Sequence, residues 1–148
     1  MAQKIKISKK AVEEFEYNYW NAFVYFLGNS EIDELSGLLR KCFLIYWYAS
    51  EVSNGGHGQY FENQSDTDFN EVIDSLQSFG AIEHLEILKE AISIQPEDFD
   101  SLSDVEVDIL GEQENKLDDR FYYAKPDLMD LLEAIQKKHE KEIIEWVD

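Results

Sequence analysis

The segment from Glu51 to Asn63 reads EVSNGGHGQYFEN and directly follows a strongly apolar run, CFLIYWYA at residues 42–49. Three of its glycines fall within four positions. The Asn-Gly-Gly tripeptide tolerates positive φ, so it predicts that a buried helix ends after Ser53. We expect a sharp corner there, followed by a short helical segment over residues 57–62. Side-chain amides of the segment can bond the backbone groups that a corner leaves free.

Helical periodicity extends in both directions from this corner. Upstream, apolar spacing predicts two helices, near residues 9–27 and 31–53, with Gly28-Asn29 ending the first. Downstream, the polar run SDTD (residues 65–68) predicts the start of a third helix, which Gly80 ends. A fourth helix is expected from Ile82 to just before Pro96.

The last third of the chain contains two further helix signals. Ser103-x-x-Glu106 matches a capping box and opens a fifth helix, although the alternation of residues 105, 107 and 109 leaves a short strand as an alternative. Pro126 suits the first turn of a last helix that continues to Val147. We therefore predict an all-α fold, a single compact bundle of about six helices in one domain over residues 1–148.

The composition is that of a folded but very acidic protein. Apolar residues make up 44% of the 148 residues and the net charge is −19. Residues 1–50 carry equal numbers of acidic and basic groups, so the whole excess lies in residues 51–148. Such a surface repels nucleic acid and anionic membranes and attracts basic partners. No apolar run reaches the roughly 20 residues of a membrane span, and no secretory signal is visible. With the single cysteine Cys42 expected in the core, this indicates a cytoplasmic protein.

Candidate catalytic and metal-binding residues are few. His57, His84 and His139 have no metal-ligand spacing, and the acids after Asn63 lack the glycine of a calcium loop. We place His84 and His139 at the surface or at the core boundary, on helices rich in charge, and predict no catalytic residue, no metal and no cofactor. The alternative is a small-molecule or hydrolase-like site at the corner, where Glu51 or Glu62 would orient His57 as a general base.

The quoted segment also resembles the C-terminal domain of a bacterial family of DNA-mimic proteins, a domain of unknown function. The family pattern is Glu-x-x-Asn-Gly-Gly-Phe-x-Gln-Tyr-Phe-x-Asn, and His57 stands where the pattern has an aromatic or apolar residue. The matching residues are Glu51, Asn54, Gly55, Gly56, Gln59, Tyr60, Phe61 and Asn63. Gly80-Ala81 and residues 117–122 extend the resemblance, which covers about residues 35–143. It implies an all-helical domain and, from one member, an acidic dimer that occupies the DNA-binding surface of a transcription factor.

Acidic residues are concentrated between Pro96 and Asp119, where Lys116 is the one basic residue. These acids are Glu97, Asp98, Asp100, Asp104, Glu106, Asp108, Glu112, Glu114, Asp118 and Asp119. They predict a non-enzymatic interaction surface for a basic partner, such as a DNA-binding protein, in a chain that can also form a homodimer. The alternatives are acidity that serves only solubility and, by analogy, an immunity-type protein that neutralises its partner.

Overall fold

The computed structural model describes residues 3–148, and within that range it contains eight α-helices, two short 3₁₀ helices and two short strands. The predicted all-α class is therefore confirmed, apart from one small sheet. The chain divides into two compact units. The first unit comprises the chain up to Trp47 together with Leu128–Asp148, and the second unit comprises Tyr48–Asp127. Each unit is described by itself.

The first unit brings the two ends of the chain together. Strand β1 (Ile5–Ser8) pairs in parallel with β2 (Ile144–Val147), with Ile5 opposite Ile144. The helices of this unit are α1 (Lys9–Glu14), α2 (Tyr17–Asn29), the 3₁₀ helix η1 (Ile32–Glu34), the first part of α3 (Gly37–Asn63), α7 (Leu128–Lys138) and α8 (Glu140–Ile143). Cys42 is fully buried here, as predicted, and burial raises the pKa of its thiol to about 12.

Three boundaries in the first unit differ from the sequence-based expectations. The first expected helix is broken at Phe15, whose backbone is extended, and α2 then continues through Gly28 to Asn29. The last expected helix is divided at His139 into α7 and α8, and the helix stops at Ile143 because the residues after it pair with β1. Pro126 lies two residues before α7 rather than in its first turn. Strand pairing between distant segments competes with local helix propensity, and here pairing prevails.

The second unit contains the rest of α3, α4 (Phe69–Ser78), α5 (Ile82–Ser93), the 3₁₀ helix η2 (Phe99–Ser101) and α6 (Asp104–Tyr123). Asp68 caps α4 by accepting backbone N–H bonds, and Gly80 follows α4 with a φ of 73°. The predicted capping box of Ser103 and Glu106 opens α6. The alternative strand over residues 105–109 is wrong, since these residues form the first turns of α6.

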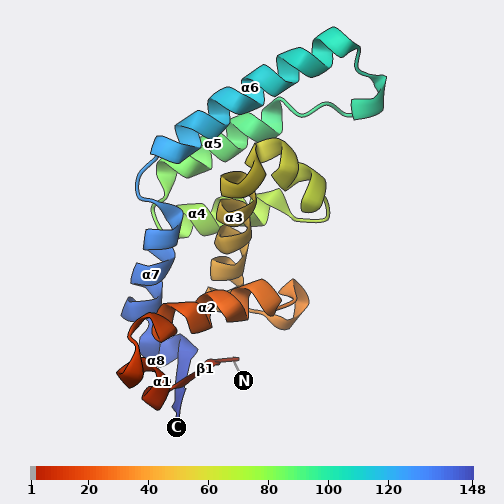
Figure 1. The fold of residues 1–148 in the computed structure, drawn as a ribbon. Helices are drawn as coiled ribbons and strands as arrows, with labels where there is room; N and C mark the ends of the chain where they lie inside the picture. Colours follow the sequence, from red (N-terminus) through yellow and green to blue (C-terminus); the bar gives the residue numbers. More distant parts are fainter. Residues whose placement is uncertain (1–2) are drawn as a thin grey trace. The chain divides into compact units, whose positions relative to one another are not determined.

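Helices α5 and α6 lie side by side and run antiparallel (Figure 1). Two hydrogen bonds show that the helices run in opposite directions. Gln95, just after the end of α5, bonds Glu114 in the middle of α6. Glu83, at the start of α5, bonds the backbone N–H of Lys125, just after the end of α6. Buried residues of both helices, with Ala124, form a core cluster that includes Ile87 and Leu117. Since Glu114 already lies opposite Gln95, which follows the end of α5, residues 104–113 extend past that end. We call residues 104–113 the α6 overhang.

Candidate functional site

The interruption of the helix at the glycine-rich corner is shorter than we expected from the sequence. The helix does not end after Ser53, as we had expected, but continues through Gly55 and is interrupted only at Gly56. Gly56 has φ 83° and ψ 179°, a region of backbone space that is nearly restricted to glycine. A Cβ atom at this position would also overlap the carboxylate of Asp118 on α6. Helix α3 then resumes and ends at Asn63.

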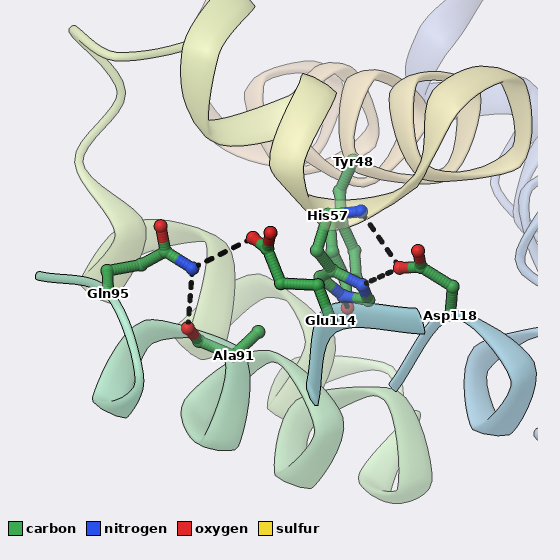
Figure 2. A network of polar contacts seen from close by, with 6 residues as sticks. All are labelled: Tyr48, His57, Ala91, Gln95, Glu114 and Asp118. Carbon is green, nitrogen blue, oxygen red and sulfur yellow. Dashed lines mark hydrogen bonds and ion pairs between the residues drawn. The ribbon is translucent and has the colours of Figure 1, made fainter. Parts of the chain in front are cut away.

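The interruption at Gly56 presents His57 to α6. Asp118 Oδ1 accepts two hydrogen bonds from His57, one from the backbone N–H at 2.9 Å and one from ring Nδ1 at 2.7 Å. The other ring nitrogen, Nε2, lies 2.9 Å from the hydroxyl of Tyr48. His57 and Tyr48 are both fully buried. We call Tyr48, His57 and Asp118 the His57 network, shown in Figure 2.

The hydrogen bonds of the His57 network define one neutral tautomer. Because carboxylate oxygen only accepts, Nδ1 carries the proton, and Nε2 then accepts from the Tyr48 hydroxyl. Burial lowers the pKa of His57, while the hydrogen bond to Asp118 opposes that shift. Burial also holds the pKa of the Tyr48 phenol well above its ordinary value of 10.0. The network is thus built to hold a neutral imidazole and a neutral phenol.

A second carboxylate of α6 lies beside the network. Glu114 Oε2 accepts a 3.1 Å hydrogen bond from the side chain of Gln95, which also donates to the backbone oxygen of Ala91 (Figure 2). Burial raises the pKa of Glu114, and the nearby charge of Asp118 adds to that effect. A Cβ atom at Gly58 would lie 3.3 Å from Glu114 Oε1, so the glycine allows close packing of α3 against α6.

The remaining family-pattern residues form the outer part of the corner. Glu51 Oε2 accepts hydrogen bonds from the amide of Gln59 at 3.1 Å and from that of Asn63 at 2.9 Å. These bonds join successive turns on both sides of Gly56. Asn54 and Gly55 are exposed. The amides of Gln59 and Asn63 thus donate to a side-chain carboxylate and not to the free backbone groups that we expected them to bond.

Two aromatic residues of the pattern pack inward. The Tyr60 ring contacts the rings of Tyr48 and Phe61, and Phe61 packs against the core cluster of α5 and α6. The Tyr60 hydroxyl is buried with no hydrogen-bond partner among the described residues. Burial, with a contribution from Glu51, raises its pKa.

Chemically, the His57 network holds two helices together. An imidazole with no exposed surface and both nitrogens engaged has no vacant position for a substrate, and its closest acid is Asp118 rather than Glu51 or Glu62. Sequence reasoning missed the partnership of His57 with Asp118, since 61 residues separate them. The one available signal was the substitution of a polar residue at an aromatic position of the pattern.

The other histidines are placed differently by the structure. His84 is buried, not at the surface or the core boundary as predicted, and its ring meets that of Phe121 edge to face at a centroid distance of 5.3 Å. Its Nδ1 has no hydrogen-bond partner among residues 3–148, and burial lowers its pKa. His139 is half-buried at the start of α8. Within the same residues, no group of three or more His, Cys, Asp or Glu side chains is arranged to hold a metal ion.

The ten predicted surface acids fall into three groups. Glu114 and Asp118 are half-buried and engaged beside His57, so they do not belong to an exposed surface. Asp98 and Glu106 are exposed but accept backbone N–H bonds at the starts of η2 and α6. The others are exposed: Glu97, Asp100, Asp104, Asp108, Glu112 and Asp119. Asp104, Asp108 and Glu112 are spaced four residues apart along the α6 overhang.

These features define a class: small, acidic helical proteins with a glycine-dependent corner and a densely acidic helix. A family model described as DMP19-like protein matches residues 33–139, and the chain belongs to that family. No curated protein and no solved structure matched the chain. None of the helices in the described part of the chain combines the length and apolar character needed to cross a membrane.

Proposed function

We propose that this protein is a non-enzymatic interaction domain that binds a basic, DNA-binding protein and competes with DNA for it. The observation that carries the proposal is the α6 overhang, on which exposed acids stand on successive turns while Leu110 is buried. Asp104, Asp108 and Glu112 are all exposed. Side chains four residues apart on a helix lie about 5–6 Å from each other. The three carboxylates thus form a line about 12 Å long.

Such a line acts on a partner as a short stretch of phosphate backbone does. A protein surface that binds DNA presents cations spaced to contact successive phosphates. The same cations can contact carboxylates on successive helical turns, and the net charge of −19 favours encounter over long range. Binding of this kind weakens as salt screens the charges.

Two apolar side chains on the overhang support an interaction role over solubility alone. Val105 is 68% exposed and Ile109 is 50% exposed, and their four-residue spacing puts them on one helix face among the acids. A helix that serves only solubility is expected to carry few exposed β-branched residues. On an interaction surface, they provide apolar contacts that phosphate groups lack and that a specific partner can bury.

A hydrolase or small-molecule site at the corner has no comparable support. The proposed general base, His57, is fully buried, and the amides of Gln59 and Asn63 are bonded to Glu51. We therefore base the function on the α6 overhang rather than on the corner.

The test is affinity capture with charge reversal at two places. Asp104→Lys, Asp108→Lys and Glu112→Lys are combined in one variant, and Glu13→Lys, Glu14→Lys and Glu31→Lys in a control with the same change in net charge. All six positions are exposed. The first variant should lose the captured protein at low salt, whereas the control variant retains it. Equal capture by wild type and the overhang variant, or capture that high salt does not weaken, would contradict the proposal.

Competition with DNA distinguishes mimicry from other acidic-partner roles. The captured protein is purified and bound to a labelled DNA duplex, and the wild-type chain is titrated in. Mimicry predicts displacement of the duplex, and the overhang variant should displace it far less. A captured protein that binds no DNA would instead favour the immunity-type alternative, in which the chain neutralises a basic partner.

A further inference from the structure

A second feature of the α5–α6 pair lies away from the overhang. A groove of about 550 Å³ opens where the start of α5 faces the end of α6, within the size range of ligand pockets, roughly 300–1,000 Å³. Its floor contains Ile87 and Ala124, which are both nearly fully buried. Ile82 and Tyr123 line its sides, and Tyr123 is 74% exposed. The groove thus offers an apolar channel with an aromatic wall.

Charged groups surround this channel and are mostly negative. Glu83, Glu86 and Asp119 line the groove. The single cation among the lining residues, Arg120, forms an ion pair with Glu90, which is outside the lining. Arg120 therefore has its own carboxylate. Glu83 accepts a hydrogen bond from the backbone N–H of Lys125 but keeps its charge, so the three acids make the groove negative.

This combination selects among possible occupants. An anion or a nucleic acid is repelled by the three carboxylates, and a second copy of a chain with net charge −19 is disfavoured for the same reason. A purely apolar group would bring no counter-charge to the acids. An arginine side chain meets all the features, since its aliphatic stem packs on apolar surface while its guanidinium binds carboxylates. The guanidinium also stacks favourably on an aromatic face such as that of Tyr123.

We propose that the α5–α6 groove is an arginine-anchor site, which takes an arginine side chain from a basic protein partner. This inference rests on the proposed function for the nature of the partner, but it uses a different surface. The α6 overhang supplies carboxylates along a line, whereas the groove supplies one apolar and anionic pocket. The two surfaces can therefore be tested separately, with defined peptides in place of the natural partner.

The direct test is a titration of the isotope-labelled protein, followed by NMR, with an alanine-based helical peptide that carries two arginines four residues apart. Matched peptides carry lysine or citrulline, which is the neutral analogue of arginine, at those two positions. The arginine peptide should shift amide signals near Ile82, Glu86 and Tyr123. We expect the citrulline peptide to bind at least about tenfold more weakly, because it loses the charge-assisted hydrogen bonds. The lysine peptide should bind about twofold to fivefold more weakly, because its ammonium lacks the planar fork and stacks less well.

The chain offers a matched control for each groove variant. Tyr123→Ala should weaken the arginine peptide about twofold to fivefold, whereas Tyr25→Ala, at a similarly exposed tyrosine that does not line the groove, should not. Glu86→Gln should weaken binding by a similar factor, and Glu112→Gln on the overhang should not. Thermal melting confirms that the exposed substitutions leave the fold intact. Equal binding of the lysine and arginine peptides, or equal losses in the control variants, would overturn the arginine anchor.

The natural partner distinguishes the two proposals. If reversal of the overhang acids abolishes capture but Tyr123→Ala and Glu86→Gln leave it unchanged, the overhang function stands and the arginine anchor is overturned. If the arginine peptide binds the groove selectively while overhang reversal leaves capture unchanged, the anchor stands and the overhang function fails.

Discussion

At the scale of single residues, the positive φ of Gly56 makes the His57 network possible. The glycine turns the chain so that the backbone N–H and the ring of His57 both reach one oxygen of Asp118. A buried donor left without an acceptor costs about 1–3 kcal/mol, so the carboxylate is required once the imidazole is buried. The buried imidazole of His57 is thus accommodated by a partner 61 residues away.

The glycine requirement gives the first prediction. Gly56→Ala should destabilise the protein by roughly 1–3 kcal/mol from backbone strain, and further if Asp118 is displaced. Gly111→Ala is the matched control, because Gly111 lies inside α6 without positive φ and its added Cβ would meet nothing within 4 Å. That substitution should stabilise the protein by up to about 1 kcal/mol. Chemical denaturation measures the free energy of unfolding of both variants. A Gly56→Ala variant as stable as wild type would contradict the role assigned to the corner.

The buried histidines predict how stability depends on pH. Burial lowers the pKa of His57 and of His84 from the ordinary value of 6.5, although Asp118 opposes the shift at His57, and Glu83 and Asp127 oppose it at His84. In the unfolded chain both histidines therefore bind protons more readily than in the folded protein. Their effect on stability is absent above about pH 6.5 and becomes unfavourable as the pH falls below that value.

Replacing His84 should reduce this dependence. Thermal melts at about pH 7.5 and about pH 5.5 should show a smaller loss of stability in His84→Phe than in wild type. The phenyl ring also removes a buried nitrogen that has no partner among the described residues. The raised pKa of Glu114 acts in the opposite direction, but it does so in wild type and in His84→Phe alike, so it does not affect the comparison. An unchanged slope in His84→Phe would exclude His84 as a source of the pH dependence.

At the scale of elements, α6 is one helix with two environments. From Glu114 onward, it packs against α5 and contributes Leu117 to the core. The α6 overhang depends more on local interactions, of which the capping box of Ser103 and Glu106 is the clearest. Leu110 is buried, but most other side chains of the overhang are exposed. Segments with few buried contacts open more readily than densely packed ones. The proposed interaction surface is therefore on the less restrained half of the helix.

Hydrogen exchange measures this difference directly. Backbone amides of residues 108–112 should exchange at least about tenfold faster than those of residues 115–121, because fewer tertiary contacts oppose local opening. Addition of the captured partner should slow exchange in the overhang, and the overhang charge-reversal variant should show no such protection. Uniform slow exchange along α6 in the free protein would mean that the overhang is held as firmly as the half of α6 that packs against α5.

At the scale of the whole molecule, the net charge of −19 affects both stability and binding. Like charges repel within the folded chain, and salt screens that repulsion over a Debye length of roughly 10 Å at 0.1 M. The excess is confined to residues 51–148, so self-repulsion is concentrated in the part of the chain that contains the acidic helix. An acidic surface that attracts basic partners therefore reduces the stability of the protein that carries it.

Salt should accordingly stabilise the free protein. Raising NaCl from about 20 mM to about 300 mM should increase the melting temperature, since screening weakens the repulsion among carboxylates. The variant with Asp104, Asp108 and Glu112 replaced by lysine should show a smaller increase, because it has six fewer net negative charges. Differential scanning calorimetry at both concentrations checks this. An equal increase in wild type and variant would indicate a general salt effect rather than relief of repulsion near α6.

Local signals predicted a large part of this structure. Helical periodicity, the Ser103–Glu106 capping box, the Asp68 cap and the Gly80 stop all depend on neighbours in the chain, and all appear in the structure. The corner after the apolar run was also placed correctly to within three residues. Predicted helix boundaries were wrong where a segment distant in sequence forms contacts. One example is the end of the last helix, where Ile144–Val147 pairs with Ile5–Ser8.

By itself, the sequence determined the helical class, the acidity, the family pattern and the position of the corner, because each depends on composition or on residues close in the chain. Only the tertiary structure decided which acids are exposed and which are used internally, since Glu114 and Asp118 face α3 while Asp104 and Asp108 do not. Tertiary packing likewise paired His57 with Asp118, buried His84 and formed the groove between α5 and α6. These features depend on contacts between helices that are distant in sequence, and no local pattern encodes which faces will meet.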